Sequence, residues 1–468
     1  MLQLPTDCIN DILEYLVDER NTLYSCLLVN KLWCEISVRI LWRNIRNYNT
    51  LMTCLPSESK EILSKNGIVI STLTSKPPMF NYASFCKSLS IYLIYYNMRL
   101  LLKQQSIPSQ NLDDKIYLVS QEILKFLMSQ IPSLKRLEIL YVPLKQNTIF
   151  TSYPGAKDCL NDLSELYCHS YVYPEFFYQL AQICHNIHTL NIRFKKVISN
   201  GLTDLISAQK NLKYLNIHQY KECEDLTDII TSLTKIPNTL RNLKINGGYH
   251  YMKLSFITKF TNLQELTLLF RNINSFEDFK ILQYFTFSKL QILKFRYECP
   301  RNELLINFLE NNGNNLREFY ISKSNDSLNS AIIKFCPNIK KLSAGITNNE
   351  LESLKMFFNG CQYLESIQIQ ICEGYLSEKD IFEVIAKYSP QYFYELKLNY
   401  SYRVKSELLP EELESFFVNW SNRIPQKPLS LIFVDSIDTF SFRRNSENKK
   451  IIDKYINMGF FILIFNIS

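Results

Sequence analysis

Hydrophobic positions recur along most of the chain in one short pattern. In the segment IPSLKRLEI, residues 131–139, the spacing L-x-x-L-x-L falls on Leu134, Leu137 and Ile139. Ten further copies follow, and their first positions step by 23 to 29 residues as far as Phe393. Alternate residues of a strand point to opposite faces, so each copy predicts a short strand with one apolar side.

The segments between these copies have helical periodicity. In LSEKDIFEVIAKY, Ser377 and Asp380 have capping-box spacing, and Ile381 and Ile385 then share one helical face. In PEELESFFVNW, Pro410 suits a first helical turn. A unit of one strand and one helix cannot bury its own apolar face, so the units must stack. The pattern therefore predicts an α/β solenoid, with parallel strands on its concave face and helices on its convex face.

This pattern resembles the leucine-rich repeats, in the variant that contains cysteine. The form C-x-x-L-x-x-L-x-L-x-x-C is complete from Cys361 to Cys372. The asparagine ladder of other repeat classes is missing, and its position is occupied by Tyr220, Gly248 and Arg271. Weaker copies extend the array at both ends, at Cys86/Leu89/Ile91, Leu429/Ile432/Val434 and Phe460/Leu463/Phe465.

The first 45 residues have a different pattern. Three short amphipathic runs, 4–16, 23–33 and 34–45, predict three helices, and the last two contain Trp33 and Trp42. A bundle of this size is smaller than domains that are usually stable alone. It also carries more apolar surface than one three-helix core can bury. We therefore expect this surface to pack against a partner protein, with packing against the first repeats as the simpler alternative.

The N-terminal residues also resemble an F-box. The likeness covers positions 4–45 and consists of Leu-Pro-x-Asp from Leu4, a leucine at Leu16, Leu-Val-Asn-Lys-x-Trp ending at Trp33, and Leu-Trp-Arg from Leu41. It departs from the common pattern at Val17-Asp18, where a turn with proline is frequent, and at Cys34. The resemblance implies docking on a Skp-type adaptor, which joins the F-box to a cullin scaffold and a RING protein. The adaptor-binding residues that we predict are Leu4, Pro5, Ile9, Leu13, Leu16, Val29 and Trp33.

Composition and charge exclude several classes of protein. The 468 residues carry 52 basic and 45 acidic side chains, a mild excess for this length, so we expect no nucleic-acid partner. No apolar run reaches the roughly 18–20 residues that span a bilayer, and we expect no membrane contact. Thirteen cysteines without a C-x-x-C pair suit a reducing compartment. We expect a cytoplasmic or nuclear protein.

Motifs of catalysis and cofactor binding are missing. The sequence has no G-x-G-x-x-G, no P-loop, no G-x-S-x-G and no H-E-x-x-H. Cys168-His169 and Cys184-His185 carry metal-capable side chains, but their spacing fits no standard zinc pattern. We expect no cofactor, no metal and no catalytic residue.

The resulting domain assignment has three parts: an F-box at 1–46, a connecting region with irregular first repeats at 47–130, and leucine-rich repeats at 131–468. An F-box followed by such repeats resembles the substrate-recognition subunit of a Skp–cullin–F-box E3 ubiquitin ligase. Three alternatives remain open. They are an adaptor or scaffold that binds a Skp-type protein without ubiquitylation, a repeat protein whose N-terminal helices only cap the solenoid, and a nucleic-acid binder.

The repeat phase also predicts which residues face outward from the strands. Basic and aromatic side chains gather at these positions in the middle of the array, which suits an acidic or phosphorylated segment of an unknown target protein. A hydrated surface with incidental charges is the alternative. The predicted target-binding residues are Arg193, Tyr214, His218, Lys244, Lys294, Arg296 and Tyr320.

Overall fold

The computed structural model describes most of the chain as two compact units. The described residues are 4–69, 78–105, 111–140, 150–223, 225–249, 252–345, 351–371, 377–400, 408–424, 427–435 and 446–467. The first unit comprises Met1–Cys223 and Thr227–Thr239, and the second comprises Glu224–Leu226 and Leu240–Ser468. These units divide the chain within the predicted repeats. The domain boundaries at residues 46 and 130 therefore stay a prediction.

The first unit begins with the three expected helices, α1 (Thr6–Glu14), α2 (Arg20–Cys26) and α3 (Lys31–Leu41). Asn30 caps α3 by accepting a hydrogen bond from the Trp33 amide at 3.0 Å. The buried core of this bundle consists of Ile9, Leu13, Leu23, Cys26, Ile36 and Ile40, with Leu16, Leu32, Trp33 and Leu41 packed against it.

The region that connects the bundle to the repeats is folded. Its helices are α4 (Tyr48–Thr53), α5 (Ser57–Lys65), η1 (Tyr82–Phe85), α6 (Ile91–Lys103) and α7 (Leu112–Gln130), and its strand is β1 (Ser88–Ser90). The Arg43 carbonyl accepts hydrogen bonds from the amides of Lys87 and Ser88 at 2.9 and 3.0 Å. The Trp42 and Tyr82 rings pack 4.4 Å apart. These contacts join the end of the bundle directly to the first strand.

The described part of the first unit contains five parallel strands, which follow chain order. They are β1, β2 (Arg136–Ile139), β3 (Glu165–His169), β4 (Thr189–Phe194) and β5 (Tyr214–Gln219). Their register aligns one apolar row, which is almost completely buried: Leu89, Leu137, Leu166, Leu190 and Leu215. The remaining helices of this unit are η3 (Phe150–Ser152), α8 (Ala156–Asn161), α9 (Pro174–Ile183), α10 (Gly201–Ser207) and α11 (Thr227–Leu233).

In the residues that the structure describes, the second unit repeats the same arrangement over nine parallel strands. They are β6 (Asn242–Gly247), β7 (Glu265–Phe270), β8 (Ile292–Tyr297), β9 (Glu318–Tyr320), β10 (Lys341–Ser343), β11 (Ser366–Ile371), β12 (Glu395–Tyr400), β13 (Leu429–Asp435) and β14 (Phe461–Ile467). The helices between them are η4 (Leu254–Lys259), η5 (Ile273–Phe276), α12 (Phe279–Leu282), α13 (Asn302–Asn312), η6 (Gly313–Asn315), α14 (Asp326–Phe335), α15 (Leu351–Gly360), α16 (Glu378–Tyr388), α17 (Pro410–Ser421) and α19 (Ser446–Asn457).

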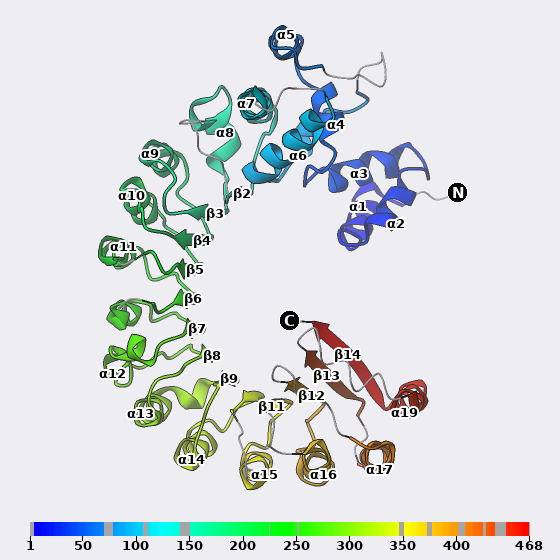
Figure 1. Ribbon diagram of the computed structural model, residues 1–468, viewed down its shortest axis with the longest axis vertical. Coiled ribbons are helices and arrows are strands. Elements are labelled where there is room, and N and C mark those ends of the chain that lie inside the picture. The colour runs from blue at the N-terminus through cyan, green and yellow to red at the C-terminus, as the bar shows by residue number, and fades with distance from the viewer. Residues whose placement is uncertain are drawn as a thin grey trace. The chain divides into compact units, whose positions relative to one another are not determined.

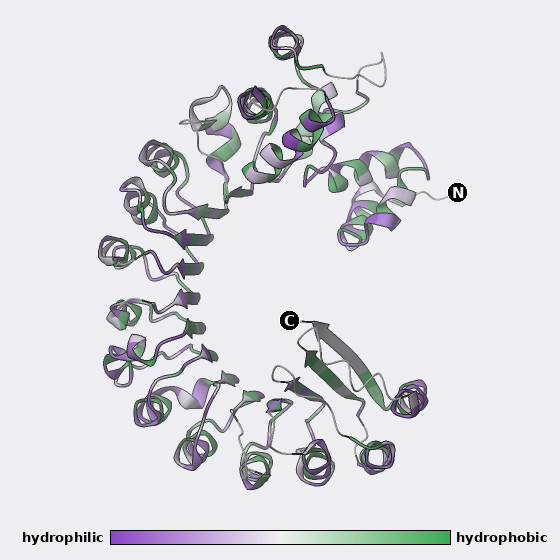
Figure 2. Ribbon diagram, viewed as in Figure 1, coloured by the Kyte–Doolittle hydropathy of each residue, from purple (hydrophilic) through white to green (hydrophobic). Residues whose placement is uncertain are grey.

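Within the repeats of each unit the strands lie side by side on one face and the helices lie on the other (Figure 1). The helices carry hydrophobic and hydrophilic residues together, as expected of amphipathic helices that cover one side of a strand layer (Figure 2). Two of them begin as their sequences predict. Ser377 accepts a hydrogen bond from the Asp380 amide at 3.1 Å, and Pro410 occupies the first turn of α17. The predicted α/β solenoid is confirmed.

One predicted register is wrong. The sequence pattern placed Ile432 and Val434 on the core side of β13, but Leu431 and Phe433 align with the inward residues Leu396 and Leu398 of β12. Four successive apolar residues in this strand fit either face, so the pattern alone does not define which pair is inward. The weaker copies at the two ends do form strands, β1 and β14.

Candidate functional site

The helix bundle presents some of its predicted adaptor-binding residues to solvent. Leu4 is 54% exposed and Val29 is 57% exposed, and Pro5 is also exposed. Leu16 and Trp33 are partly buried against the core of the bundle. These five residues keep some or all of their surface available to a partner.

The other two predicted residues need a correction. Ile9 and Leu13 are 2% and 0% exposed and belong to the core of the bundle. Helical spacing puts them on the same face, but that face packs against α3. Their side chains therefore stabilise the bundle, and we do not retain them as contact residues.

Several exposed apolar residues of the bundle were missed by the sequence analysis. Leu28 and Tyr15 are both 89% exposed, and Ile12, Val17 and Tyr24 are also exposed. They follow the ends of α1 and α2 or lie on the solvent side of these helices. Helical spacing from Leu13 would have placed Ile12 outside the buried face. Large apolar side chains exposed together are typical of interaction surfaces.

The bundle is also held by an ion pair between the last residue of α1, Glu14, and Arg43, which follows α3. Two nitrogens of the Arg43 guanidinium donate to the Glu14 carboxylate, one of them at 2.6 Å. These hydrogen bonds lower the pKa of Glu14 from its usual 4.5. The pair ties the end of α1 to Arg43. The carbonyl of Arg43 also accepts hydrogen bonds from the amides of Lys87 and Ser88, at the start of the first strand.

We expect Glu14→Gln to lower the free energy of unfolding by about 0.5–1 kcal/mol at neutral pH, the range for a partly exposed pair. Because the pKa of Glu14 is lower in the folded chain, this stabilisation is present above pH 4.5 and is lost as the pH falls further. Urea unfolding at pH 7 and at mildly acidic pH measures the difference. Glu35→Gln is the control, because the Glu35–Lys31 pair is 4.0 Å long and Lys31 is exposed; an equal effect of both variants would contradict the prediction.

The first unit carries three of the predicted target-binding residues. Arg193 on β4 lies beside His218 on β5, and Tyr214 lies at the start of β5, largely in solvent. On the neighbouring strand, burial and the charges of Lys195 and Arg193 lower the pKa of His169 to about 4. Burial and these neighbouring charges thus keep His169 neutral at pH 7.

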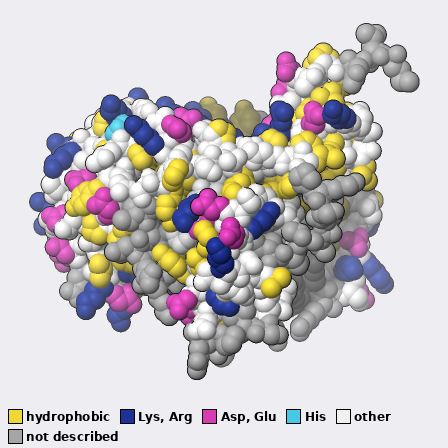
Figure 3. All heavy atoms as spheres, turned by 90° about the horizontal axis from the view of Figure 1, so that it is seen from above, with side chains coloured by type: hydrophobic (Ala, Val, Ile, Leu, Met, Phe, Trp, Pro, Cys, Tyr) yellow, Lys and Arg dark blue, Asp and Glu magenta, His cyan; other side chains and the backbone are white. Residues whose placement is uncertain are grey.

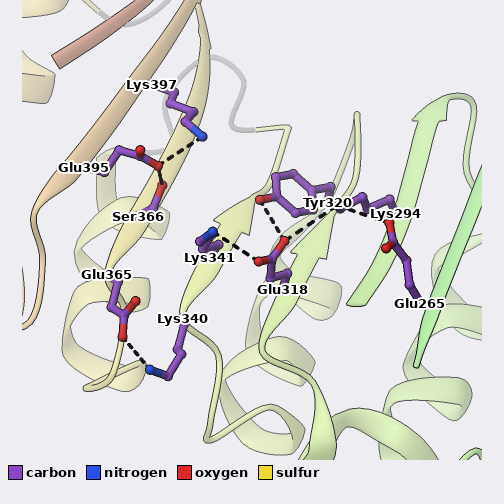
Figure 4. Close-up of polar contacts among 10 residues, drawn as sticks. All are labelled: Glu265, Lys294, Glu318, Tyr320, Lys340, Lys341, Glu365, Ser366, Glu395 and Lys397. Atoms are coloured by element: carbon purple, nitrogen blue, oxygen red, sulfur yellow. Dashed lines mark hydrogen bonds and ion pairs between the residues drawn. The ribbon is translucent and has the colours of Figure 1, made fainter. Parts of the chain in front are cut away.

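The second unit carries the other four residues, and two of them lie in a network of ion pairs (Figure 4). The Lys294 ammonium lies 3.4 Å from Glu265 and 3.7 Å from Glu318. The Tyr320 hydroxyl contacts Glu318 at 3.4 Å, and burial with this carboxylate raises the pKa of the tyrosine. Lys294 also lies 5.1 Å from the centre of the Tyr320 ring. The positive charge that the sequence suggested at Lys294 is therefore balanced within the chain.

The network continues along the following strands. Lys341 pairs with Glu318 at 3.2 Å, which raises the pKa of the lysine. The other pairs are Lys340 with Glu365 at 2.5 Å and Lys397 with Glu395 at 3.0 Å. Lys341 and Glu318 occupy equivalent positions of β10 and β9, so aligning the repeats could have revealed this pair. On the face drawn in Figure 3, acidic and basic side chains are also intermixed.

The two remaining residues are exposed. Lys244 on β6 forms no ion pair with a described carboxylate, and neither does Arg296 on β8. The Arg296 guanidinium lies 5.6 Å from the centre of the Tyr297 ring. Of the basic residues predicted in this unit, Lys294 thus forms ion pairs with described glutamates, whereas Lys244 and Arg296 form none with a described carboxylate.

Metal-capable side chains do not cluster in the described residues. These residues contain no group of three His, Cys, Asp or Glu side chains that could hold a metal ion. Burial raises the pKa of the Cys184 and Cys361 thiols to about 12, as expected of core residues. Among the described helices none is long and apolar enough to cross a membrane.

A comparison with known protein families identifies the family of the helix bundle. The match to the F-box-like family covers residues 1–48. Residues 1–48 form an F-box-like domain. In this F-box-like domain α1, α2 and α3 build the core, and the strand array that follows is a leucine-rich-repeat solenoid. No curated protein matches the chain.

Two solved structures are similar to this chain over much of its length. The leucine-rich repeat-containing protein LegL7 from Legionella pneumophila is 14% identical, with a TM-score of 0.39, and covers 69% of this chain and 98% of its own. A chain of the Rad7–Elc1 complex in yeast is 15% identical, with a TM-score of 0.38, and covers 93% of this chain and 87% of its own.

Proposed function

We propose that this chain is the substrate-recognition subunit of a Skp–cullin–F-box E3 ubiquitin ligase. The F-box-like domain binds a Skp-type adaptor and, through it, the cullin and RING subunits. The strand face of the repeats binds a target protein. The chain itself performs no catalysis; it holds the target near a ubiquitin-loaded enzyme that other subunits supply, and so contributes proximity.

The observation that carries this proposal is the exposed apolar surface of the F-box-like domain. Leu28, Val29 and Leu4 are more than half exposed in a domain whose own core is already complete. Monomeric proteins rarely expose such side chains together unless another protein covers them. The same domain matches the F-box-like family over residues 1–48. Packing against the first repeats involves Trp42 and Arg43 and leaves these three residues uncovered.

Affinity purification of the tagged full chain tests the proposal. We expect the adaptor, the cullin and the RING protein to co-purify with the wild-type chain and to be absent when the F-box surface is mutated. Adaptor without cullin would favour a scaffold that recruits no ligase. Capture of neither would overturn the proposal and favour a repeat protein whose N-terminal helices only cap the solenoid.

A further inference from the structure

One position that precedes the strands changes its character along the second unit. It lies three residues before the residues that the strand register aligns, which are Glu318, Lys341, Ser366, Glu395 and Ser430. Before β9 it is Asn315, whose amide donates to the Ser288 carbonyl at 3.1 Å. Before β10 it is Asn338, whose amide donates to the Asn314 carbonyl at 2.9 Å. These amides connect each repeat to the one before it.

The next three repeats have Tyr363, Tyr392 and Lys427 at this position. The two tyrosine rings are nearly parallel, with their centres 6.0 Å apart, and the Lys427 ammonium lies 5.3 Å from the centre of the Tyr392 ring. Tyr363 is 52% exposed and Tyr392 is 41% exposed. Neither hydroxyl forms a hydrogen bond within the part of the chain that the structure describes. An exposed aromatic surface thus replaces the amides that connect the earlier repeats.

Buried neighbours fix the loops that carry these side chains. The Arg423 guanidinium donates to the hydroxyl and to the carbonyl of Ser389, three residues before Tyr392. The Trp420 side chain is buried, and its indole N–H donates to the Lys427 carbonyl at 3.1 Å. The aromatic surface is therefore held in place before a ligand binds, which lowers the entropy that binding costs.

The carboxylates that follow the two tyrosines in sequence already have a cation. Glu365 pairs with Lys340 at 2.5 Å (Figure 4). Glu395 pairs with Lys397 at 3.0 Å. These acids are thus not available to attract a basic partner. The groups that remain on the aromatic surface are hydrogen-bond donors, namely two tyrosine hydroxyls and the Lys427 ammonium.

We propose that Tyr363, Tyr392 and Lys427 bind a proline-rich segment of a partner protein in the polyproline II conformation. Proline has no N–H group, and the carbonyls of this conformation form no internal hydrogen bonds, so the segment offers acceptors to these three donors. Proline-rich segments dock on aromatic side chains, and their preformed conformation loses little entropy on binding. The proposal does not depend on the ligase assignment, because it concerns a different surface and a different partner.

Fluorescence anisotropy of a labelled octaproline peptide, titrated with the full chain, tests this surface. We expect saturable binding by the wild type, and binding about tenfold weaker, or not measurable, by Tyr363→Ala/Tyr392→Ala. Tyr284→Ala is the matched control, because Tyr284 is 75% exposed in the same unit but lies between α12 and β8. The proposal is overturned if the wild type shows no saturable binding, if the double variant binds equally, or if a glycine–serine peptide of the same length binds as tightly.

The Tyr363→Phe/Tyr392→Phe variant separates the hydroxyls from the rings. It keeps both aromatic faces and removes two donors, so it should bind octaproline more weakly than the wild type and more tightly than the alanine variant. Binding equal to that of the wild type would contradict the role of the hydroxyls. A dimer that the wild type forms in sedimentation and the alanine variant does not would overturn the proposal in favour of a second copy of the chain.

The fold and the adaptor provide independent readouts. Both tyrosines are largely exposed, so the alanine and phenylalanine variants should melt like the wild type. They should also still co-purify with the adaptor. Failure of the proline-binding surface and failure of the ligase assignment are therefore distinguishable.

Discussion

Replacing Leu4 and Pro5 with alanine is expected to abolish co-purification of a Skp-type adaptor. Both side chains are exposed and precede α1, so their truncation does not touch the core residues of the bundle. Burial of a leucine-sized side chain contributes about 1.5–3 kcal/mol, and about 1.4 kcal/mol corresponds to a tenfold change in affinity. Loss of two such contacts should weaken the complex about a hundredfold, which removes the adaptor from an affinity column.

Two further variants serve as controls, one for adaptor binding and one for folding of the bundle. Ile424→Ala removes an apolar side chain that is 97% exposed in the second unit, and it should leave adaptor binding unchanged. Leu13→Ala should lower the melting temperature, because Leu13 is in the core of the bundle. Circular dichroism should show the Leu4/Pro5 variant to be as folded as the wild type. Adaptor retained by that variant would refute the assignment of this surface.

The repeats could be predicted because their signal is redundant. Each copy places a leucine or a similar residue at the same point of a strand, and errors in one copy do not affect the others. Leu266, Leu293 and Phe319 accordingly lie side by side in the core, as their spacing predicts. In LIFV at residues 431–434 apolar and polar residues do not alternate, and the predicted register of this strand is wrong by one residue.

The surface residues were less predictable, because exposure depends on neighbours that the sequence does not place. Spacing put Ile9 and Leu13 on an apolar face, but it did not show that α3 covers this face. The outward phase of Lys294 is correct, yet its charge is balanced by glutamates of the two adjacent strands.

The remaining target-binding residues stay a prediction. Arg193, Tyr214 and His218 lie on adjacent strands of the first unit, and Lys244 and Arg296 lie on strands of the second. Each retains some exposed surface.

Saturation with the adaptor is expected to stabilise the F-box-like domain by about 4 kcal/mol when the free adaptor exceeds its dissociation constant a thousandfold. The adaptor covers side chains such as Leu28 that only the folded bundle arranges together. The Arg43 carbonyl also binds the Lys87 and Ser88 amides, so part of this stabilisation should reach the beginning of β1.

Hydrogen exchange with and without the adaptor measures this effect residue by residue. Core amides of α1, α2 and α3 should exchange about a thousandfold more slowly in the complex, because their exchange requires the bundle to open. The Lys87 and Ser88 amides should be protected to a smaller extent, since the strand pairing also holds them. Amides of β7 and β8 should not change, and the Leu4/Pro5 variant should show no protection at the same adaptor concentration. Equal exchange in the free and the saturated chain would mean that the adaptor does not bind the folded bundle, and the assignment of the exposed F-box surface would then be wrong.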